Sequence, residues 1–503
     1  MTAITPLRRI LIVGGGTAGW IAACHLAKKL TPRGIIVTLV ESPNIPTIGV
    51  GEGSVPMMRD TLKYFGIRED AFISQCDVTF KQSVKFIDWN NESASGEYYH
   101  HLFDYPQWRG QTEDWLAKPA LSRNSYADQV SWQGRLADAG FAPKAITQPQ
   151  FDGVCNYAYH LDAAKFTDML TVHGKSLGVE HLLADVVAVD YCEEQGIRSV
   201  STAQLGTLSA DLYVDCTGFA ARLIDEACKV PFIDKGDVLL VDTAIVAQVP
   251  YPDAHTPIPC FTKSTAKEAG WIWDIGLSTR RGTGYVYSSR HTSDERAAEV
   301  LRQYLGEAAP TEFRKIPMKV GYRERSWHKN CVAIGLSSGF VEPLEATGLL
   351  IFDVTSRMLA ETMPHCLEAM PLVANRYSAQ VCQTWLKVID FIKLHYVLSS
   401  RRDTEFWRDN QASESIPDTL KELLALWRYQ VPTPYEFAST MDIFKQENFL
   451  YVLYGMAYPT QVPATAIEDG AEVTANVAQR LMKQLLPHRQ LIDKIKQYGL
   501  QQV

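Results

Sequence analysis

The spacing of apolar residues at the start of the chain alternates between two periods, as is typical of an α/β protein. Residues 9–13 form a short apolar run, and a glycine-rich segment with helical spacing over residues 21–27 follows it. A second apolar run, residues 35–40, has the length and residue types of a buried parallel strand. This order predicts a βαβ unit. Residues 42–56 are rich in Gly and Pro and predict a loop, before a helix at residues 57–65.

The middle of the chain is predicted to hold one helix and then mostly strands. Residues 162–177 have helical spacing, and alternating patterns predict strands at residues 185–189, 197–203 and 210–214. Residues 235–330 are strand-like and contain turn signals.

From about residue 349 onward the pattern becomes helical. Helical spacing is clear at residues 387–397 and 420–427, and an amphipathic stretch at residues 474–498 is interrupted by Pro487. No internal repeat and no low-complexity linker separates these parts. One compact body with interleaved segments is therefore expected.

Composition and charge exclude several classes of protein. Hydrophobic residues make up 46% and charged residues 21% of the 503 residues, which is ordinary for a globular protein. The net charge of -8 without a basic tract argues against nucleic acid as a partner. The ten cysteines show no Cys-x-x-Cys pair and no Cys/His cluster, so no disulfide framework and no metal site is expected, and a cytoplasmic location fits best. No apolar run approaches the roughly 20 residues that span a membrane.

A glycine-rich loop at residues 14–19 predicts a dinucleotide site. Its sequence, Gly-Gly-Gly-Thr-Ala-Gly, satisfies the Gly-x-Gly-x-x-Gly pattern between a strand and a helix. Gly14 permits the tight turn, Gly16 lets a pyrophosphate approach the backbone, and Gly19 allows close packing of helix and strand. The N-terminus of the helix then stabilises the phosphate charge.

Two further features belong to this predicted nucleotide site. Thr17 and Ala18 lie in the loop itself, and Glu41 follows Gly19 by 22 residues, the spacing of a carboxylate that binds ribose hydroxyls. The alternative is a glycine-rich turn without a ligand. The motif indicates a dinucleotide and does not by itself choose between FAD and NAD.

Three later segments, in this order, carry a resemblance to a known family. They are residues 79–86 with Lys81, residues 270–277 (Gly-Trp-Ile-Trp-Asp-Ile-Gly-Leu) and residues 342–348 (Glu-Pro-Leu-Glu-Ala-Thr-Gly). Together with the glycine loop they resemble the flavin-dependent halogenases, of which the tryptophan halogenases are the best-known branch. The resemblance spans most of the chain and is weakest after about residue 410.

The resemblance implies a fold and a division of the chain. It implies an α/β protein with an FAD-binding, flavin-monooxygenase-like core of the glutathione-reductase type, a β-rich substrate region and a mostly helical C-terminal region. The core would cover residues 1–350, with substrate segments interleaved at about residues 80–150 and 235–330. Residues 351–503 would close the substrate site.

The same resemblance selects FAD as the cofactor. Residues 49–53 resemble the family's flavin strap, residues 211–219 resemble a second flavin-contacting strand and turn, and residues 333–338 stand where a third contact is expected. For each apolar residue, core packing is the alternative. The residues placed against FAD are Gly51, Val186, Leu336 and Leu349, of which Val186 would meet the adenine through its backbone.

The chemistry that the resemblance implies rests on four residues. Lys81 matches the family's catalytic lysine, and Glu345 matches the glutamate across the substrate from it. Thr347 and Gly348 match the pair whose backbone N–H groups hold halide beside the flavin, as suits amides that open a helix. An ordinary solvated charge is the alternative for Lys81, and an exposed loop acid is the alternative for Glu345.

The local pattern around Lys81 predicts one continuous strand. On that strand Phe80, Val84 and Phe86 would share one face, and Lys81, Ser83 and Lys85 the other. Only the resemblance selects Lys81 over Lys85.

Aromatic residues are expected to shape the substrate site. His101 and Phe103 match a segment that sandwiches the indole ring in tryptophan halogenases, with core packing as the alternative. Trp271 and Trp273 would keep the organic substrate away from the flavin. Gly276 stands where the family has Pro, which predicts a more mobile loop. Residues 395–396 and 401–407 are also family-like and are assigned to the architecture.

One absence bears on the substrate. Tryptophan halogenases clamp the amino acid's backbone with an acidic residue, a Phe-Trp pair and a Tyr-Tyr pair. Residues 442–444 and 448–453 show neither aromatic pair. Indole or an indole-like compound is therefore expected to react better than free tryptophan, and a larger tethered substrate that reaches into an open site is the alternative.

The function that the resemblance implies is FAD-dependent halogenation. Reduced FAD, O2 and chloride or bromide would yield hypohalous acid, which would halogenate an electron-rich arene, a small aromatic substrate. A second Gly-x-Gly-x-x-Gly is absent, so a separate NAD(P)H-dependent flavin reductase is the expected partner; a homodimer is one assembly open to the chain. The alternatives are a flavin-dependent hydroxylase of the same fold and a non-catalytic FAD-binding sensor or scaffold.

Overall fold

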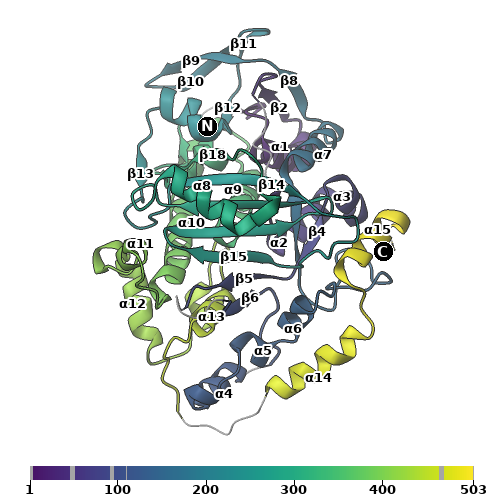
Figure 1. Ribbon diagram of the computed structural model, residues 1–503. Coiled ribbons are helices and arrows are strands. Elements are labelled where there is room, and N and C mark those ends of the chain that lie inside the picture. Colours follow the sequence, from purple (N-terminus) through teal and green to yellow (C-terminus); the bar gives the residue numbers. More distant parts are fainter. Residues whose placement is uncertain (1–3, 46–50, 91–95, 109, 464–469, 502–503) are drawn as a thin grey trace.

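The computed structural model describes residues 4–45, 51–90, 96–108, 110–463 and 470–501, and Figure 1 shows their arrangement. A six-stranded sheet lies beside the N-terminus, in the order β20-β21-β12-β1-β2-β8, and all of its strand pairs are parallel except β20–β21. The βαβ unit predicted at the start of the chain is confirmed. The strands are β1 (Arg9–Val13), β2 (Ile36–Glu41), β8 (Glu180–Leu183), β12 (Leu212–Asp215), β20 (Trp327–His328) and β21 (Cys331–Ala333).

Helices α1, α7 and α9 pack together beside this sheet. The predicted helix at residues 162–177 is confirmed, since Asp162 caps α7 by accepting hydrogen bonds from the backbone N–H groups of Ala164 and Lys165. Unpaired N–H groups at a helix start require such an acceptor, which explains the boundary. The helices are α1 (Thr17–Leu30), α7 (Ala163–Ser176) and α9 (Thr347–Thr362).

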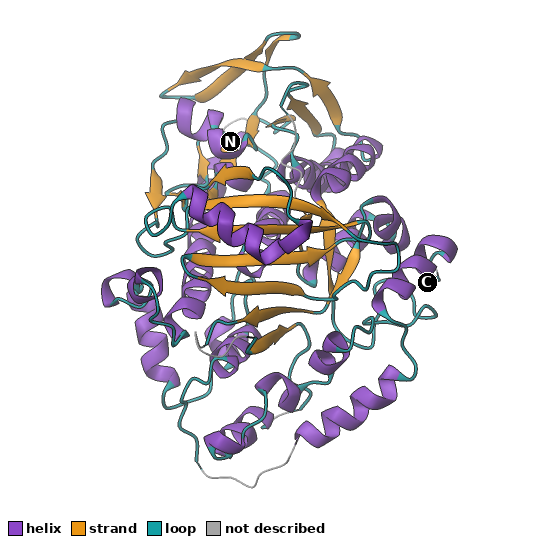
Figure 2. Ribbon diagram, in the orientation of Figure 1, coloured by secondary structure: helices purple, strands orange, loops and turns teal. Residues whose placement is uncertain are grey.

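A seven-stranded sheet forms the centre of the molecule (Figure 2). Its order is β18-β14-β17-β16-β15-β5-β6, so strands from residues 83–102 and from residues 243–317 share one sheet, joined by the parallel pair β15–β5. The strands are β5 (Ser83–Ile87), β6 (Tyr98–Leu102), β14 (Thr243–Pro250), β15 (Thr262–Lys267), β16 (Gly270–Gly276), β17 (Arg280–Tyr287) and β18 (Arg314–Pro317).

Helix α8 (Asp294–Leu305) covers one face of this sheet, as Figure 2 shows, through a core that includes Ile245, Ile272, Tyr285 and Leu301. Its sequence lies inside the region predicted as strands with turns, so that prediction was wrong over these residues. The helix is amphipathic and begins at a Ser293 cap, a signal that the surrounding strand-like pattern obscured.

Three small sheets complete the β structure of the described residues. The sheet β3-β7-β4 contributes to the site described below. The other two are β11-β10-β9 and β13-β19-β22. Their strands are β3 (Gly51–Gly53), β4 (Thr79–Lys81), β7 (Ala158–Asp162), β9 (Val186–Cys192), β10 (Gly196–Thr202), β11 (Gly206–Leu208), β13 (Phe232–Asp234), β19 (Gly321–Arg323) and β22 (Gly339–Phe340).

The stretch predicted as one strand around Lys81 is two strands. The chain leaves the small sheet after β4 and enters the large sheet at β5, with Gln82 between them. Consequently Lys81 and Val84, predicted on opposite faces, line the same cavity. The prediction failed because each strand takes its partners from a distant segment, β7 for β4 and β6 with β15 for β5.

The segment at about residues 80–150 is less β-rich than expected, because helices follow β6. The last two helices of the chain return to this part, as Figure 1 shows: α14 packs against α5 and α6, and α15 packs against α3. The helices near this segment are α2 (Met57–Phe65), α3 (Glu69–Gln75), α4 (Gln111–Ala117), α5 (Tyr126–Val130) and α6 (Gln133–Asp138).

The C-terminal region is helical, as predicted from about residue 349 onward. No helix in the described ranges is both long enough and apolar enough to cross a membrane. The helices are α10 (Met370–Leu398), α11 (Glu405–Asp409), α12 (Asp418–Trp427), α13 (Gln446–Gly455), α14 (Gly470–Met482) and α15 (His488–Tyr498).

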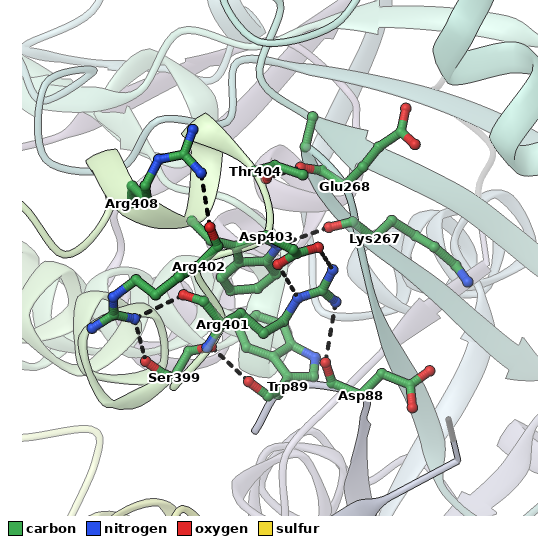
Figure 3. Close-up of polar contacts among 12 residues, drawn as sticks. Asp88, Trp89, Lys267, Glu268, Ser399, Arg401, Arg402, Asp403, Thr404 and Arg408 are labelled. Atoms are coloured by element: carbon green, nitrogen blue, oxygen red, sulfur yellow. Dashed lines mark hydrogen bonds and ion pairs between the residues drawn. The ribbon is translucent and has the colours of Figure 1, made fainter. Parts of the chain in front are cut away.

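The end of α10 is fixed to the large sheet by the polar segment that follows it (Figure 3). The Ser399 hydroxyl donates to the Trp89 carbonyl at 2.6 Å, and the Arg401 guanidinium donates to the Asp88 carbonyl and to the Asp403 carboxylate. The Thr404 hydroxyl donates to the Glu268 carbonyl at 2.6 Å. These bonds tie α10 to the ends of β5 and β15, so side chains on its last turns have fixed positions.

Candidate active site

The glycine loop has the geometry that a dinucleotide requires. Gly14 has φ 110°, and a Cβ there would lie 2.3 Å from the Cys216 carbonyl oxygen, while a Cβ on Gly19 would lie 2.0 Å from the Gly14 carbonyl oxygen. At Gly16, in contrast, a Cβ would meet nothing within 4 Å, and this residue precedes α1 without a side-chain cap. Open space before uncapped N–H groups, which include those of Thr17 and Ala18, fits a pyrophosphate.

Glu41 ends β2 beside this loop. One carboxylate oxygen contacts Nε2 of His181 at 2.6 Å, and a Cβ on Gly15 would lie 1.7 Å from the other oxygen. The carboxylate therefore lies over the glycine loop, where a ribose hydroxyl would meet it. Val186 begins β9 and is half-buried against a neighbouring core.

A cavity of about 230 Å³ lies between the small sheet β3-β7-β4, the large sheet and the start of α9. Gly51, Leu336 and Leu349, predicted to contact the flavin, line it together. Residues 49 and 50 of the predicted strap lie outside the described residues. The wall is mostly apolar, and the charged residues among the described lining are Glu52, Lys81 and Glu345.

Lys81 is buried in this cavity instead of being a solvated charge. It is 1% exposed, its Nζ donates to the Ser54 carbonyl at 3.2 Å, and the ammonium lies 5.2 Å from the centre of the Phe103 ring. Burial lowers the pKa of Lys81 to about 8, although Glu345 acts in the opposite direction. Lys85, in contrast, forms an ion pair with Asp138 at 2.7 Å outside the cavity.

Glu345 is buried in the wall of the same cavity and is held by two imidazoles. Its Oε1 lies 2.6 Å from Nδ1 of His101 and 3.0 Å from Nε2 of His395. Burial raises the pKa of Glu345, but the two histidines outweigh it and hold the pKa well below its usual range. The backbone is left-handed here, with φ 64° at Glu345 and 56° at Ala346.

The ring of His395 is oriented by two contacts in this cluster. Its Nδ1 lies 2.9 Å from the carbonyl oxygen of Phe391, and its Nε2 lies 3.0 Å from Oε1 of Glu345. The ring therefore bridges helix α10 and the Glu345 carboxylate, which fixes the position of the carboxylate.

Thr347 and Gly348 are the first two residues of α9, directly after Glu345 and Ala346. Gly348 lines the cavity, and Ala346, which precedes the helix, gives it no side-chain cap. The Thr347 hydroxyl turns away and donates to the Glu342 carbonyl at 3.3 Å. The first backbone N–H groups of α9 are thus the groups that can hold an anion at this wall.

Trp271 and Trp273 lie on β16 and line the same cavity. Trp273 lies across Gly284 of β17, where a Cβ would be 2.0 Å from the indole, so only glycine fits beneath it. Trp271 donates its indole N–H to Oε2 of Glu342 at 2.7 Å. Gly276, expected in a mobile loop, is instead the last residue of β16, buried and paired with Arg281, so that expectation was wrong about its place.

His101 and Phe103 come to this site from the end of β6. His101 is 1% exposed, and its other ring nitrogen lies 3.0 Å from Nδ2 of Asn448 on α13. It therefore orients Glu345, while Phe103 lies beside Lys81. The predicted contact of His101 and Phe103 with an arene stays a prediction.

From the sequence, His395 and Tyr396 were assigned to the architecture and Glu342 had no role. In the structure, His395 contacts Glu345, and the Tyr396 hydroxyl donates to Glu342. His395 and Glu345 are 50 residues apart in the sequence, and no sequence motif predicts their contact. The one available signal was the spacing of Glu342 and Glu345, three residues apart in a segment of Gly, Pro and apolar residues.

The region expected to lack a clamp for an amino acid is packed into the core. Phe444 stacks on Phe391, Phe449 packs edge-on against the same ring, and Asp442 forms an ion pair with Lys387. Among the described residues, no group of three or more His, Cys, Asp and Glu side chains is arranged to hold a metal ion. All ten cysteines are free.

These features are those of a flavin-dependent halogenase. The glycine loop fits a dinucleotide, one cavity joins the predicted flavin contacts to a buried lysine and glutamate, and the first amides of α9 are open to it. The profile of the family described as tryptophan halogenase matches residues 9–470. The chain therefore belongs to the tryptophan halogenase family, as the sequence motifs indicated.

Relatives agree with this assignment over nearly the whole chain. Tryptophan 6-halogenase SttH from Streptomyces toxytricini is 37% identical over 84% of both chains. The crystal structure of a tryptophan halogenase from Shewanella frigidimarina is 41% identical, covers 99% of both chains and has a TM-score of 0.92. BrvH, a flavin-dependent halogenase from Brevundimonas, is 33% identical, covers 97% of this chain and 99% of its own, and has a TM-score of 0.86.

Membership of this family confirms the fold class and the class of reaction. The protein is an enzyme that carries out FAD-dependent halogenation of an arene and uses a halide. Enzymes of this family generally need a separate flavin reductase. The non-catalytic and hydroxylase alternatives are not supported.

Proposed function

We propose that this enzyme halogenates a neutral, indole-like arene in preference to free tryptophan, with chloride or bromide as the halide. The observation that carries the proposal is the charge of the cavity wall. Its charged residues among those described are one lysine and two glutamates, of which Lys81 and Glu345 are needed for the chemistry. A zwitterion would bury a carboxylate for which the described lining offers no further cation, because Lys81 is engaged in the chemistry and Glu52 could pair only with the ammonium. The unpaired carboxylate costs several kcal/mol.

Each site residue has a role in this proposal. Gly14, Gly16, Thr17, Ala18, Gly19 and Glu41 hold the FAD dinucleotide, and Gly51, Val186, Leu336 and Leu349 contact it. Bound in its reduced form, FAD supplies from O2 the oxidising equivalent that converts halide into hypohalous acid. The backbone N–H groups of Thr347 and Gly348 hold the halide where this occurs.

Lys81 directs the hypohalous acid at the arene. Its ammonium donates a hydrogen bond to the oxygen of the acid, which polarises the halogen toward the ring. When the carbon–halogen bond forms, the oxygen–halogen bond breaks and the oxygen takes the proton from Lys81, leaving water. The depressed pKa of Lys81 suits this step, because a weaker base releases its proton more readily.

Glu345 receives the proton that the ring loses. The carboxylate first stabilises the cationic ring, then takes the proton from the carbon that now bears the halogen. The contact with His395 holds the carboxylate in place for this step. His101 and Phe103 hold the flat ring between the two groups.

The test compares kcat/KM for indole and for tryptophan under the same supply of reduced FAD and halide. We expect indole to be preferred by about tenfold or more, the factor that partly unpaired charged ends produce. The names of the relatives favour the second candidate, free tryptophan. A clear preference for tryptophan would contradict the proposal and would mean that other residues bind the amino and carboxyl groups.

A further inference from the structure

A second buried carboxylate lies on the same turn and faces away from the cavity. Glu342 is fully buried, and its Oε2 accepts two hydrogen bonds, from the indole N–H of Trp271 at 2.7 Å and from the Tyr396 hydroxyl at 2.6 Å. Its Oε1 has no hydrogen-bond partner among the residues that the structure describes. One oxygen atom therefore joins β16, the turn at residues 342–346 and helix α10.

The partner on α10 is itself firmly placed. Tyr396 is 1% exposed and packs against Trp89 and Trp407. The segment after α10 is tied to β5 and β15 by the bonds of Ser399, Arg401 and Thr404 shown in Figure 3. The Tyr396 hydroxyl thus gives Glu342 a fixed point from which to hold the indole.

A buried lysine completes this cluster. Lys393, one turn before Tyr396, is fully buried and donates to the carbonyl oxygen of Val238 and to Oδ1 of Asn410, both uncharged acceptors. Burial lowers the pKa of Lys393 to about 7, and burial raises the pKa of Glu342 to about 7. Neither side chain lines the cavity, so any role of these two residues in the reaction is to position other residues.

We infer that Glu342 is a positioning residue, which clamps the Trp271 indole in the wall of the cavity and so keeps oxidised halide directed to the arene. This inference rests on the proposed function. Trp271 lines the cavity with Glu345 and Gly348, and both of these follow Glu342 within six residues. One side chain therefore sets the distance between the tryptophan wall and the turn that carries the acid and the halide amides.

The experiment measures coupling, the share of reduced FAD oxidised that ends as halogenated indole instead of hydrogen peroxide. In Glu342→Leu the Trp271 N–H and the Tyr396 O–H lose their acceptor, and we expect coupling to fall about fivefold or more. Glu342→Gln keeps an oxygen that accepts both bonds, so it should retain at least about half of the wild-type coupling.

Trp427 and Glu436 provide a matched control. The Trp427 indole N–H donates to Oε2 of Glu436 at 2.7 Å, the same bond at the same length, and neither residue lines the cavity. Glu436→Leu should leave coupling within about twofold of wild type. Equal coupling in wild type and a folded Glu342→Leu variant would overturn the inference, as would a Glu342→Gln variant as poorly coupled as Glu342→Leu.

A spectroscopic readout separates this inference from the proposed function. In protein labelled with 5-fluorotryptophan, the fluorine resonance of Trp271 is assigned by its loss in Trp271→Phe. It should shift in Glu342→Leu and Tyr396→Phe and stay in place in Glu436→Leu. If wild type halogenates no arene, the proposed function fails, while an unshifted Trp271 resonance in Glu342→Leu overturns the clamp alone.

Discussion

Glu342 and Glu345 lie on one turn, three residues apart and both buried, yet their carboxyl groups have different kinds of partner. Glu342 accepts from neutral donors, an indole and a phenol, and burial raises its pKa to about 7. Glu345 contacts two imidazoles near a lysine, and these hold its pKa far below the usual range against the effect of burial. The neighbours, not the residue type, set the charge of each carboxyl group.

The difference separates two tasks on either side of the turn. The side that faces the cavity keeps an ionised carboxylate, ready to stabilise positive charge and accept a proton. The side that faces the protein keeps a weakly acidic group whose oxygen fixes a large aromatic wall. A variant can break one side and leave the other intact, so the contrast is open to experiment.

The largest effect is expected on the cavity side, at Lys81. Lys81→Ala removes the ammonium that directs hypohalous acid, so halogenation should fall by at least about a thousandfold. FAD binding should survive, because Lys81 contacts no part of the glycine loop. Product is measured by mass spectrometry and FAD binding by fluorescence quenching. Lys85→Ala is the control, since Lys85 pairs with Asp138 outside the cavity; product at the wild-type level in Lys81→Ala would remove this residue from the chemistry.

The next effect sets the two glutamates against each other. Glu345→Gln removes the charge that stabilises the cationic ring and accepts its proton, so kcat should fall by about 10- to 1,000-fold. Glu342→Gln should cost only a few-fold, because its oxygen acts as an acceptor for two neutral donors. Both values of kcat come from the same assay with indole and bromide. Equal losses in the two variants would erase the contrast.

A smaller effect is expected in the dependence of the rate on pH. The pKa of Lys81 is lowered to about 8, so the ammonium, and with it the rate, should be lost as pH rises through this value. Glu345 raises the pKa of Lys81, so Glu345→Gln should move this alkaline limb to lower pH. Glu342→Gln should leave the limb in place. A rate that increases steadily above about pH 8 would mean that the neutral amine is the active form.

The smallest effect concerns stability, where the two variants should respond to pH with opposite signs. The folded pKa of Glu345 is lowered, so its ionised form stabilises the protein above the unfolded pKa, and this gain is lost as pH falls. The folded pKa of Glu342 is raised, so its contribution is lost as pH rises through about 7. In thermal unfolding, the stability deficit of Glu345→Gln relative to wild type should shrink as pH falls below about 4.5. Glu342→Gln should instead gain about 1–3 kcal/mol relative to wild type as pH rises from about 5 to 8. Parallel shifts in both variants would contradict this.

The parts of the fold that the sequence predicted are those with local causes. The helix predicted at residues 162–177, the helix at residues 57–65 and the glycine loop each depend on residues within one or two turns of each other. Helix α8 was missed because its helical periodicity lies within a long region of strand-like sequence. The break at Gln82 was missed because β4 and β5 pair with strands from other parts of the chain.

The same reasoning explains what was and was not foreseen in the site. Lys81 and Glu345 were identified through a resemblance, and the structure brings both into one cavity. Their supports were out of reach, because Glu342 meets Trp271 across 71 residues and Glu345 meets His101 across 244. Only the folded chain shows which histidine faces which acid.

The left-handed backbone at Glu345 and Ala346 limits which residues can replace Glu345. Such φ values favour Gly, Asn and Asp, while the chemistry asks for a carboxylate long enough to reach two histidines. Asn would suit the backbone but lose the charge, and Asp would keep the charge but is one methylene shorter. Glutamate therefore accepts an unfavourable backbone conformation in exchange for a side chain long enough to contact both histidines. Few other residues could replace it without loss of function.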